Sequence, residues 1–118
     1  MTTKKYDKST ELGLVDLVQG VTLSESDRLA IVWNLVLASH GTIIRTVTGI
    51  CKGIDLDERE QMVLDIEIKL VEQFNRYDAT KSRVNTWISM RARCLTLDML
   101  RANKHQHWVE LKEADNEL

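Results

Sequence analysis

Five arginines within 26 residues are the feature of this sequence with the clearest chemistry. They are Arg76, Arg83, Arg91, Arg93 and Arg101. Guanidinium groups bind phosphates through charge-assisted hydrogen bonds. Trp87 and Cys94 stand among these arginines, and an aromatic ring stacks on an unpaired base. The segment therefore predicts nucleic-acid binding. The alternative for any single arginine is a solvated helix face or an ion pair with Asp98, and the alternative for Trp87 is packing on the preceding helix.

The charges of the chain are divided into blocks. The 118 residues carry a net charge of -2, but residues 69–104 hold eight basic and three acidic groups. Residues 51–68 hold two basic and six acidic groups, and residues 105–118 hold one basic and four. The basic block predicts attraction to phosphates. The acidic block at 51–68 is either an ordinary solvated helix face or a surface that meets a basic protein.

The elements that must position these charges are predicted to be helices. The chain has no proline and only 5 glycines, which disfavours folds built from strands and turns. Capping and spacing predict helices from Thr10 to Gly20, from Ser24 to near Gly41, from Asp55 or Asp57 to about Gln73, and from Ser82 to about Ala102. Residues 42–51 are rich in β-branched side chains but have no partner strand, so they are also expected to be helical. We expect an all-α, compact helical bundle.

The same patterns divide the chain and exclude several classes of protein. Residues 1–9 are expected to be a flexible N-terminus, 10–104 a helical domain, and 105–118 an acidic tail. The sequence shows no glycine-rich phosphate loop and no nucleophile beside a base, so an enzyme is not expected. Cys51 and Cys94 are expected to be buried free thiols without a metal or other cofactor. The start lacks a signal peptide and no apolar run spans a bilayer, so the expected location is the cytoplasm.

The order of these motifs resembles a known family. Residues 57–104 contain an acidic helix, the turn Arg76-Tyr77-Asp78, and a helix reading Thr86-Trp87-Ile88, Arg91-Ala92-Arg93 and then Leu95 to Arg101. This arrangement resembles region 2 of the bacterial sigma-70 family, closest to its extracytoplasmic-function branch. The resemblance is ungapped over about 45 positions, and residues 29–51 resemble region 1.2/2.1 more loosely. It implies the fold of sigma-70 region 2.

The resemblance implies that the basic helix and the loop after it bind and open the -10 element of promoter DNA. The residues it places at the melted strand are Arg83, Trp87, Arg91, Arg93, Arg101, Asn103, Lys104 and His105, the last three in a base-capturing loop. Two histidines, His105 and His107, flank Gln106 there, and loop polar groups are favoured over a metal site.

The resemblance also implies that the acidic helix docks on the clamp helices of the RNA polymerase beta-prime subunit. The residues it places at this interface are Asp57, Glu60, Gln61 and Asp65. The chain departs from the family at Gln61 and Leu64, where Asp and Gln are usual, and at Cys94, where Asn is usual. These departures place the affinity for the clamp in doubt.

Region 4 of the family, which reads the -35 element, has no counterpart in the 118 residues. The resemblance therefore implies a minimal sigma-like factor that depends on an additional activator or coregulator. The alternative is a sigma-like interaction protein that occupies polymerase or a partner factor without productive DNA recognition. The tail adds another open choice, because Trp108 either anchors it on the core or belongs to a short amphipathic helix that binds a partner.

Overall fold

Five α-helices and one short 3-10 helix make up the part of the chain that the structure describes. The computed structural model describes residues 6–20 and 23–116, with side chains up to residue 102. The helices are α1 (Lys8–Gln19), α2 (Glu25–Leu37), α3 (His40–Ile50), α4 (Leu56–Glu72), η1 (Phe74–Arg76) and α5 (Val84–Asn116). No strand occurs in these described ranges. The prediction of an all-α fold is confirmed.

Side-chain caps explain where three of the helices begin. The Ser24 hydroxyl accepts from the backbone N–H of Asp27 at 3.3 Å, and the Asp55 carboxylate caps α4 as predicted. The predicted cap at Thr10 is wrong. Asp7 accepts from the backbone N–H of Thr10 at 2.7 Å and starts α1 at Lys8, so part of the expected flexible segment 1–9 is helical. Residues 1–5 lie outside the described residues.

The second predicted helix is two helices in the structure. α2 ends at Leu37, the chain bends by 54° through Ala38 and Ser39, and Gly41 lies inside α3 instead of ending a helix. The helical prediction for 42–51 is confirmed, and Gly53 turns the chain toward α4 with a φ of 82°. The bend matters because it gives α3 its own N-terminus.

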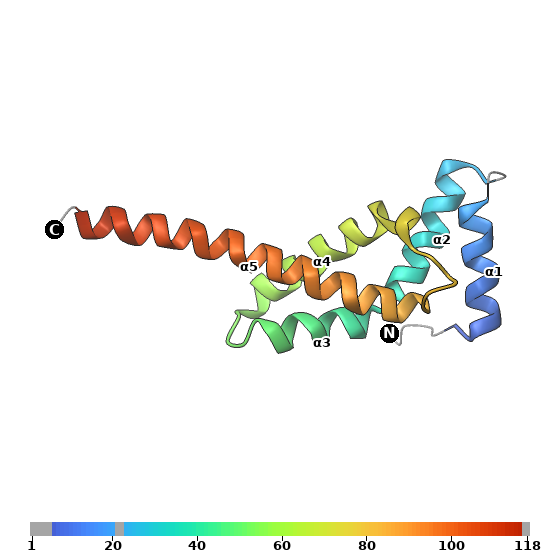
Figure 1. Cartoon of the computed structure of the whole chain (residues 1–118), viewed down its shortest axis with the longest axis horizontal. Helices are drawn as coiled ribbons and strands as arrows, with labels where there is room; N and C mark the ends of the chain where they lie inside the picture. The colour runs from blue at the N-terminus through green and yellow to red at the C-terminus, as the bar shows by residue number, and fades with distance from the viewer. Residues whose placement is uncertain (1–5, 21–22, 117–118) are drawn as a thin grey trace.

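The core lies where α2, α3, α4 and the first half of α5 meet, and α1 packs on α2 at one end (Figure 1). The most extensive contact is between α3 and α5. Fully buried aliphatic side chains come from every helix, among them Val15, Leu35, Val36, Ile43, Val47, Ile66, Leu70 and Ile88. The aromatic side chains are few, so aliphatic burial supplies most of the hydrophobic stabilisation.

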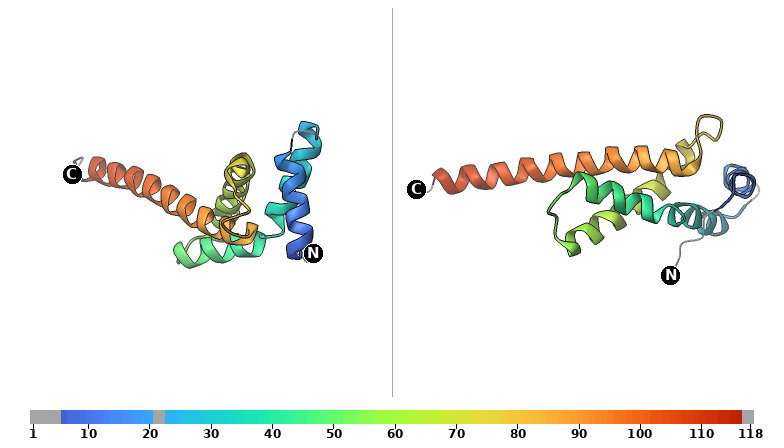
Figure 2. Two further views of the ribbon diagram at one scale, coloured as in Figure 1. Left: turned by 45° about the vertical axis from the view of Figure 1, so that its right-hand side comes forward. Right: turned by 90° about the horizontal axis from the view of Figure 1, so that it is seen from below.

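The last helix does not end near Ala102. α5 is 33 residues long, about 50 Å at 1.5 Å per residue, and its second half extends beyond the other helices (Figures 1 and 2). The backbone of 105–116 is therefore helical and continues α5, and 117–118 lie outside the described residues. The predicted role of the Trp108 side chain lies outside the described residues.

The structure also shows the exposure of the two cysteines and the hydrophobicity of each helix. Cys51 is buried as predicted, but Cys94 is exposed because it lies on the outward side of α5. Among the described helices, none alone has the length and hydrophobicity to cross a bilayer; α2 and α3 meet that criterion only as a pair, across their 54° bend.

Candidate interaction surfaces

An aromatic cluster holds the turn between α4 and α5. The Trp87 ring lies edge-on to Phe74 and Tyr77, with ring centroids 5.6 and 5.7 Å apart. The Tyr77 hydroxyl donates to the carbonyl of Ser82 at 2.6 Å, and burial, followed by the negative charge of Glu11, raises the pKa of Tyr77. Trp87 is half-buried in this cluster. Its packing role is therefore established, whereas base stacking by Trp87 stays a prediction.

Arg83 bonds other parts of the protein, although its side chain is 48% exposed. Its Nε and one terminal nitrogen each lie 3.3 Å from an oxygen of Glu11, and that nitrogen also donates to the Tyr6 carbonyl at 3.2 Å. Glu11 is buried, and one of its oxygens accepts from the backbone N–H of Val84 at 3.2 Å. Glu11 of α1 thus caps α5, the role predicted for Ser82. Arg83 stabilises this contact between α1 and the start of α5, which disfavours its predicted role as a DNA ligand.

Arg91 also has an internal partner. A terminal nitrogen of its guanidinium donates to Oε1 of Gln73 at 2.7 Å, and the residue is half-buried. Gln73 is the residue at which α4 ends. Arg91 therefore joins the end of α4 to the middle of α5, and binding a phosphate would require it to leave this bond.

Arg93 and Arg101 are the predicted DNA ligands that face outward. Arg93 is exposed and has no ion pair or side-chain hydrogen bond with any residue described in the structure. Arg101 lies 3.6 Å from Asp98, and both side chains are more than two-thirds exposed, so this pair is weak. The two arginines are about 12 Å apart along α5 and about 80° apart around it. They share the outward side of α5 with Cys94 and with Met90, which is 63% exposed.

The predicted base-capturing loop is not a loop. The backbone of Asn103, Lys104 and His105 is helical and belongs to α5, so the pocket expected from a turn at this place is absent from the described backbone. Their side chains, and that of His107, lie outside the described residues. Among the residues that are described, no group of His, Cys, Asp and Glu has the arrangement of a metal site.

The four predicted polymerase contacts lie on one side of α4. Asp57, Glu60 and Gln61 are exposed, and the half-buried Asp65 accepts from the Gln61 side chain at 3.1 Å. At 100° per residue the four positions span an arc of about 140°. The structure therefore brings these predicted residues together.

Sequence reasoning missed two apolar members of the α4 surface and misjudged one acid. Leu64 and Ile68 are 47% and 39% exposed in the middle of the arc, one helical turn apart. Their spacing opposite the buried Val63, Ile66 and Leu70 is the signal that reveals them. Glu67, counted among the solvated acids, is buried and bonds the His40 ring. We define the acidic face of α4 as Asp57, Glu60, Gln61, Leu64, Asp65 and Ile68.

Comparisons with models of protein families, with curated proteins and with solved structures give no significant match to the chain. The assignment of these surfaces therefore depends on their own chemistry. That chemistry is an exposed apolar pair framed by acids on α4 and a pair of outward arginines on α5.

Proposed function

We propose that this protein is a minimal sigma-70-like factor that binds the clamp helices of RNA polymerase through α4 and engages the melted -10 strand through α5. The observation that carries the proposal is the division of exposed chemistry between two adjacent helices. The acidic face of α4 makes no ion pair with any described residue, and Arg93 and Arg101 are the arginines of α5 whose guanidinium groups face outward, Arg101 with a weak pair to Asp98. The proposal also depends on the resemblance of residues 57–104 to sigma-70 region 2.

The acidic face of α4 has the composition of a protein-binding surface. Leu64 and Ile68 expose apolar area to water. A partner that buries this area stabilises the complex by about 25 cal/mol per Å². The surrounding Asp57, Glu60 and Asp65 favour a partner with basic residues around an apolar centre. These features support docking on a basic helical coiled coil, such as the polymerase clamp helices.

The outward side of α5 supports the DNA contact, with fewer residues than the sequence predicted. Arg93 and Arg101 neutralise two phosphates, and Met90, about one helical turn before Arg93 on the same side of α5, offers an apolar surface on which an unpaired base lies. Arg83 and Arg91 are left out of this surface because each has a partner inside the protein. We therefore expect modest intrinsic DNA affinity that increases when polymerase holds the strand nearby.

A second candidate function is regulation of transcription by occupying polymerase or another factor, without productive DNA recognition. The internal bonds of Arg83 and Arg91 favour it, because they remove two of the predicted DNA contacts. The acidic face of α4 serves both candidates equally. Transcription with purified core polymerase separates them, since promoter-specific transcripts support the first candidate and inhibition of another sigma factor supports the second.

The test of the first candidate is the double substitution Arg93→Ala and Arg101→Ala. Binding to forked -10 DNA in the presence of polymerase is measured by fluorescence anisotropy at several salt concentrations. We expect loss of at least tenfold in affinity, and a decrease of about 1.4 in the slope of log K against log salt for two single-strand phosphates. Lys69→Ala with Lys81→Ala removes two exposed charges elsewhere and is the matched control.

The polymerase contact is tested separately. Leu64→Ala with Ile68→Ala is expected to weaken binding to core polymerase, whereas Leu17→Ala, at a similarly exposed leucine of α1, is expected to leave it unchanged. Normal DNA binding by the double arginine variant would show that α5 does not contact the strand. Equal polymerase binding by the α4 and α1 variants would remove the docking role of the acidic face.

A further inference from the structure

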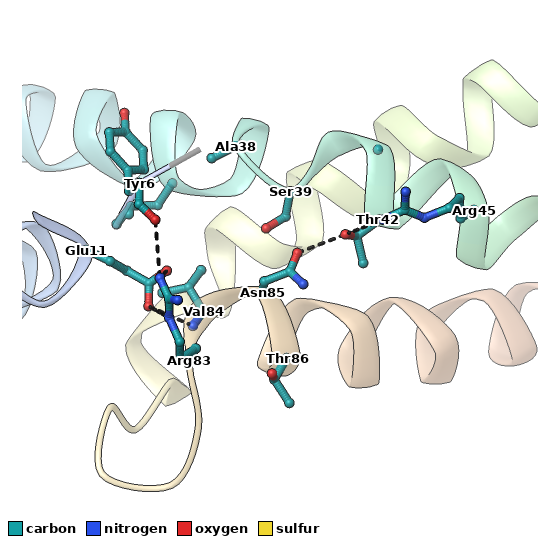
Figure 3. Close-up of a pocket in the computed structure, with 12 residues that line it drawn as sticks. Tyr6, Glu11, Ala38, Ser39, Thr42, Arg45, Arg83, Val84, Asn85 and Thr86 are labelled. Atoms are coloured by element: carbon teal, nitrogen blue, oxygen red, sulfur yellow. Dashed lines mark hydrogen bonds and ion pairs between the residues drawn. The ribbon is translucent and has the colours of Figure 1, made fainter. Parts of the chain in front are cut away.

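A cavity lies where the N-termini of α3 and α5 approach each other beside α1. Its volume is about 340 Å³, within the range of small-molecule sites. Figure 3 shows Thr42 of α3 and Asn85 of α5 on its wall, with Tyr6 and Glu11 at the other end. It is separate from the acidic face of α4 and from the outward arginines of α5.

Two helix N-termini supply unused hydrogen-bond donors to this cavity. α3 begins at Ser39, which makes no side-chain cap, and the backbone N–H groups of Gly41 and Thr42 have no acceptor among the described residues. In the first turn of α5, Glu11 satisfies only Val84, which leaves the N–H groups of Asn85 and Thr86 without an acceptor in the same part of the chain. Free N–H groups and the positive ends of two helix dipoles favour an anion.

The side chain of Ser39 independently offers an unpartnered hydroxyl to the cavity. Ser39 is only 5% exposed and lines the cavity, and its hydroxyl points into it (Figure 3). That hydroxyl forms no hydrogen bond with any side chain or backbone group of the described residues. Among the described residues no buried side-chain oxygen or nitrogen lacks a partner, so the unbonded Ser39 oxygen is open to the cavity and its hydroxyl is free to donate to a ligand there.

The charges on the cavity wall sum to one positive charge. Arg45 and Arg83 are cationic, and Glu11 is the one acid among the residues that line it. Both Glu11 oxygens are already engaged by Arg83 and Val84, so the carboxylate repels an incoming anion little. Arg45 donates to the Thr42 hydroxyl at 3.3 Å and keeps further N–H groups for a ligand.

The remaining polar groups are arranged so that donors stay available. The Thr42 hydroxyl donates to Oδ1 of Asn85 at 2.8 Å, which turns the amide nitrogen of Asn85 away from Thr42 (Figure 3). The lining also includes Leu35, Ala38 and the half-buried Tyr6. The cavity thus combines donors and positive charge with a smaller apolar surface.

We propose that this cavity binds a small phosphate ester of nucleotide size. The phosphate lies at the N-termini of α3 and α5, where it accepts from the Ser39 hydroxyl, the free N–H groups and Arg45. The organic part lies against Tyr6, Leu35 and Ala38. This inference goes beyond the proposed function and does not depend on it, because the cavity shares no residue with the acidic face of α4 or with Arg93 and Arg101.

The test is a titration of the full ¹⁵N-labelled chain followed by NMR. Inorganic phosphate and adenosine 5′-monophosphate are expected to shift the amide signals of Gly41, Thr42, Asn85 and Thr86 saturably. The nucleotide is expected to bind about tenfold more tightly than phosphate through the apolar wall, and adenosine alone is expected to leave these signals in place. A short oligothymidylate without a terminal phosphate distinguishes a small ester from a nucleic-acid backbone as the source of the phosphate.

Two substitutions test the cavity and one is the control. Ser39→Ala removes a hydroxyl that bonds nothing in the described protein, so the thermal midpoint is expected to stay unchanged while the affinity for the nucleotide falls about tenfold. Arg45→Gln is expected to lower the affinity further. Lys69→Ala removes an exposed charge of α4 outside the cavity and is expected to bind like the wild type.

Three results overturn the proposal. The first is the absence of saturable shifts with phosphate and nucleotide. The second is an equal loss of affinity in Lys69→Ala and Arg45→Gln, which identifies diffuse charge attraction in place of a site. The third is tighter binding of the oligothymidylate than of the nucleotide at the same amides, which assigns the cavity to a DNA backbone.

Discussion

Replacing Glu11 by alanine tests the contact on which the start of α5 depends. The Glu11 carboxylate is buried between α1 and α5, where it accepts from Arg83 and from the backbone N–H of Val84. The alanine variant leaves that N–H, which the structure records as buried, without a partner. It also leaves the Arg83 guanidinium without its counter-charge. Both losses act at the same helix terminus.

The magnitude follows from the exposure of each partner. Removing the side chain that caps a helix costs about 1–2 kcal/mol. Losing the ion pair costs less than losing a fully buried pair, because the Arg83 side chain is 48% exposed and water hydrates its guanidinium in the variant. This loss lowers the stability by about 0.5–1 kcal/mol. The free energy of unfolding should therefore fall by about 1.5–3 kcal/mol, a large share of the 5–15 kcal/mol typical of a domain.

Urea denaturation followed by tryptophan fluorescence measures this change. Glu25→Ala is the matched control, since Glu25 pairs with Arg28 at 3.8 Å and is 78% exposed, and its loss should cost under about 0.5 kcal/mol. A cycle with Arg83→Ala should give a coupling energy of about 1 kcal/mol. If Glu11→Ala and Glu25→Ala lower stability equally, the capping role of Glu11 is wrong.

Two further predictions concern Cys94 and Tyr77. A thiol reagent should modify Cys94 rapidly and Cys51 slowly, because Cys94 is exposed whereas burial raises the pKa of Cys51 above 9.0; a fast phase that survives in Cys94→Ser would contradict this. Burial also raises the pKa of Tyr77 above its ordinary 10.0, so the unfolded chain loses this proton first and stability should fall as the pH rises above 10. Chemical denaturation between pH 8 and about 11 should show a smaller fall for Tyr77→Phe, and identical profiles would exclude the phenol as the cause.

The sequence predicted local structure better than the pairing of side chains. Ser24, Asp55 and the apolar spacing of α4 identified helices correctly, because capping and periodicity act within a few residues. The break after Leu37 was missed because Gly41 was the stronger local stop signal, whereas the burial of Ser39 comes from tertiary packing. Local rules carry no information on such packing.

The same distinction explains the outcome at the candidate surfaces. The sequence does not reveal whether an arginine faces solvent, as Arg93 does, or bonds an acid from another helix, as Arg83 does. The partner of Arg83 is 72 positions away, so no periodicity reveals it. The α4 set was predicted from the resemblance to sigma-70 region 2, and its members lie together in the structure because they belong to one helix, where spacing determines which residues share a side.

The bond between Glu11 and Val84 also constrains the order in which the chain assembles. These residues are 73 positions apart, so the terminus of α5 is satisfied only after nearly the whole domain has been synthesised and its first helix has docked. Closing so long a loop costs entropy before the contact repays it. A nascent chain that has not yet emerged past residue 84 therefore holds an acid in α1 without the partners that it has in the folded domain.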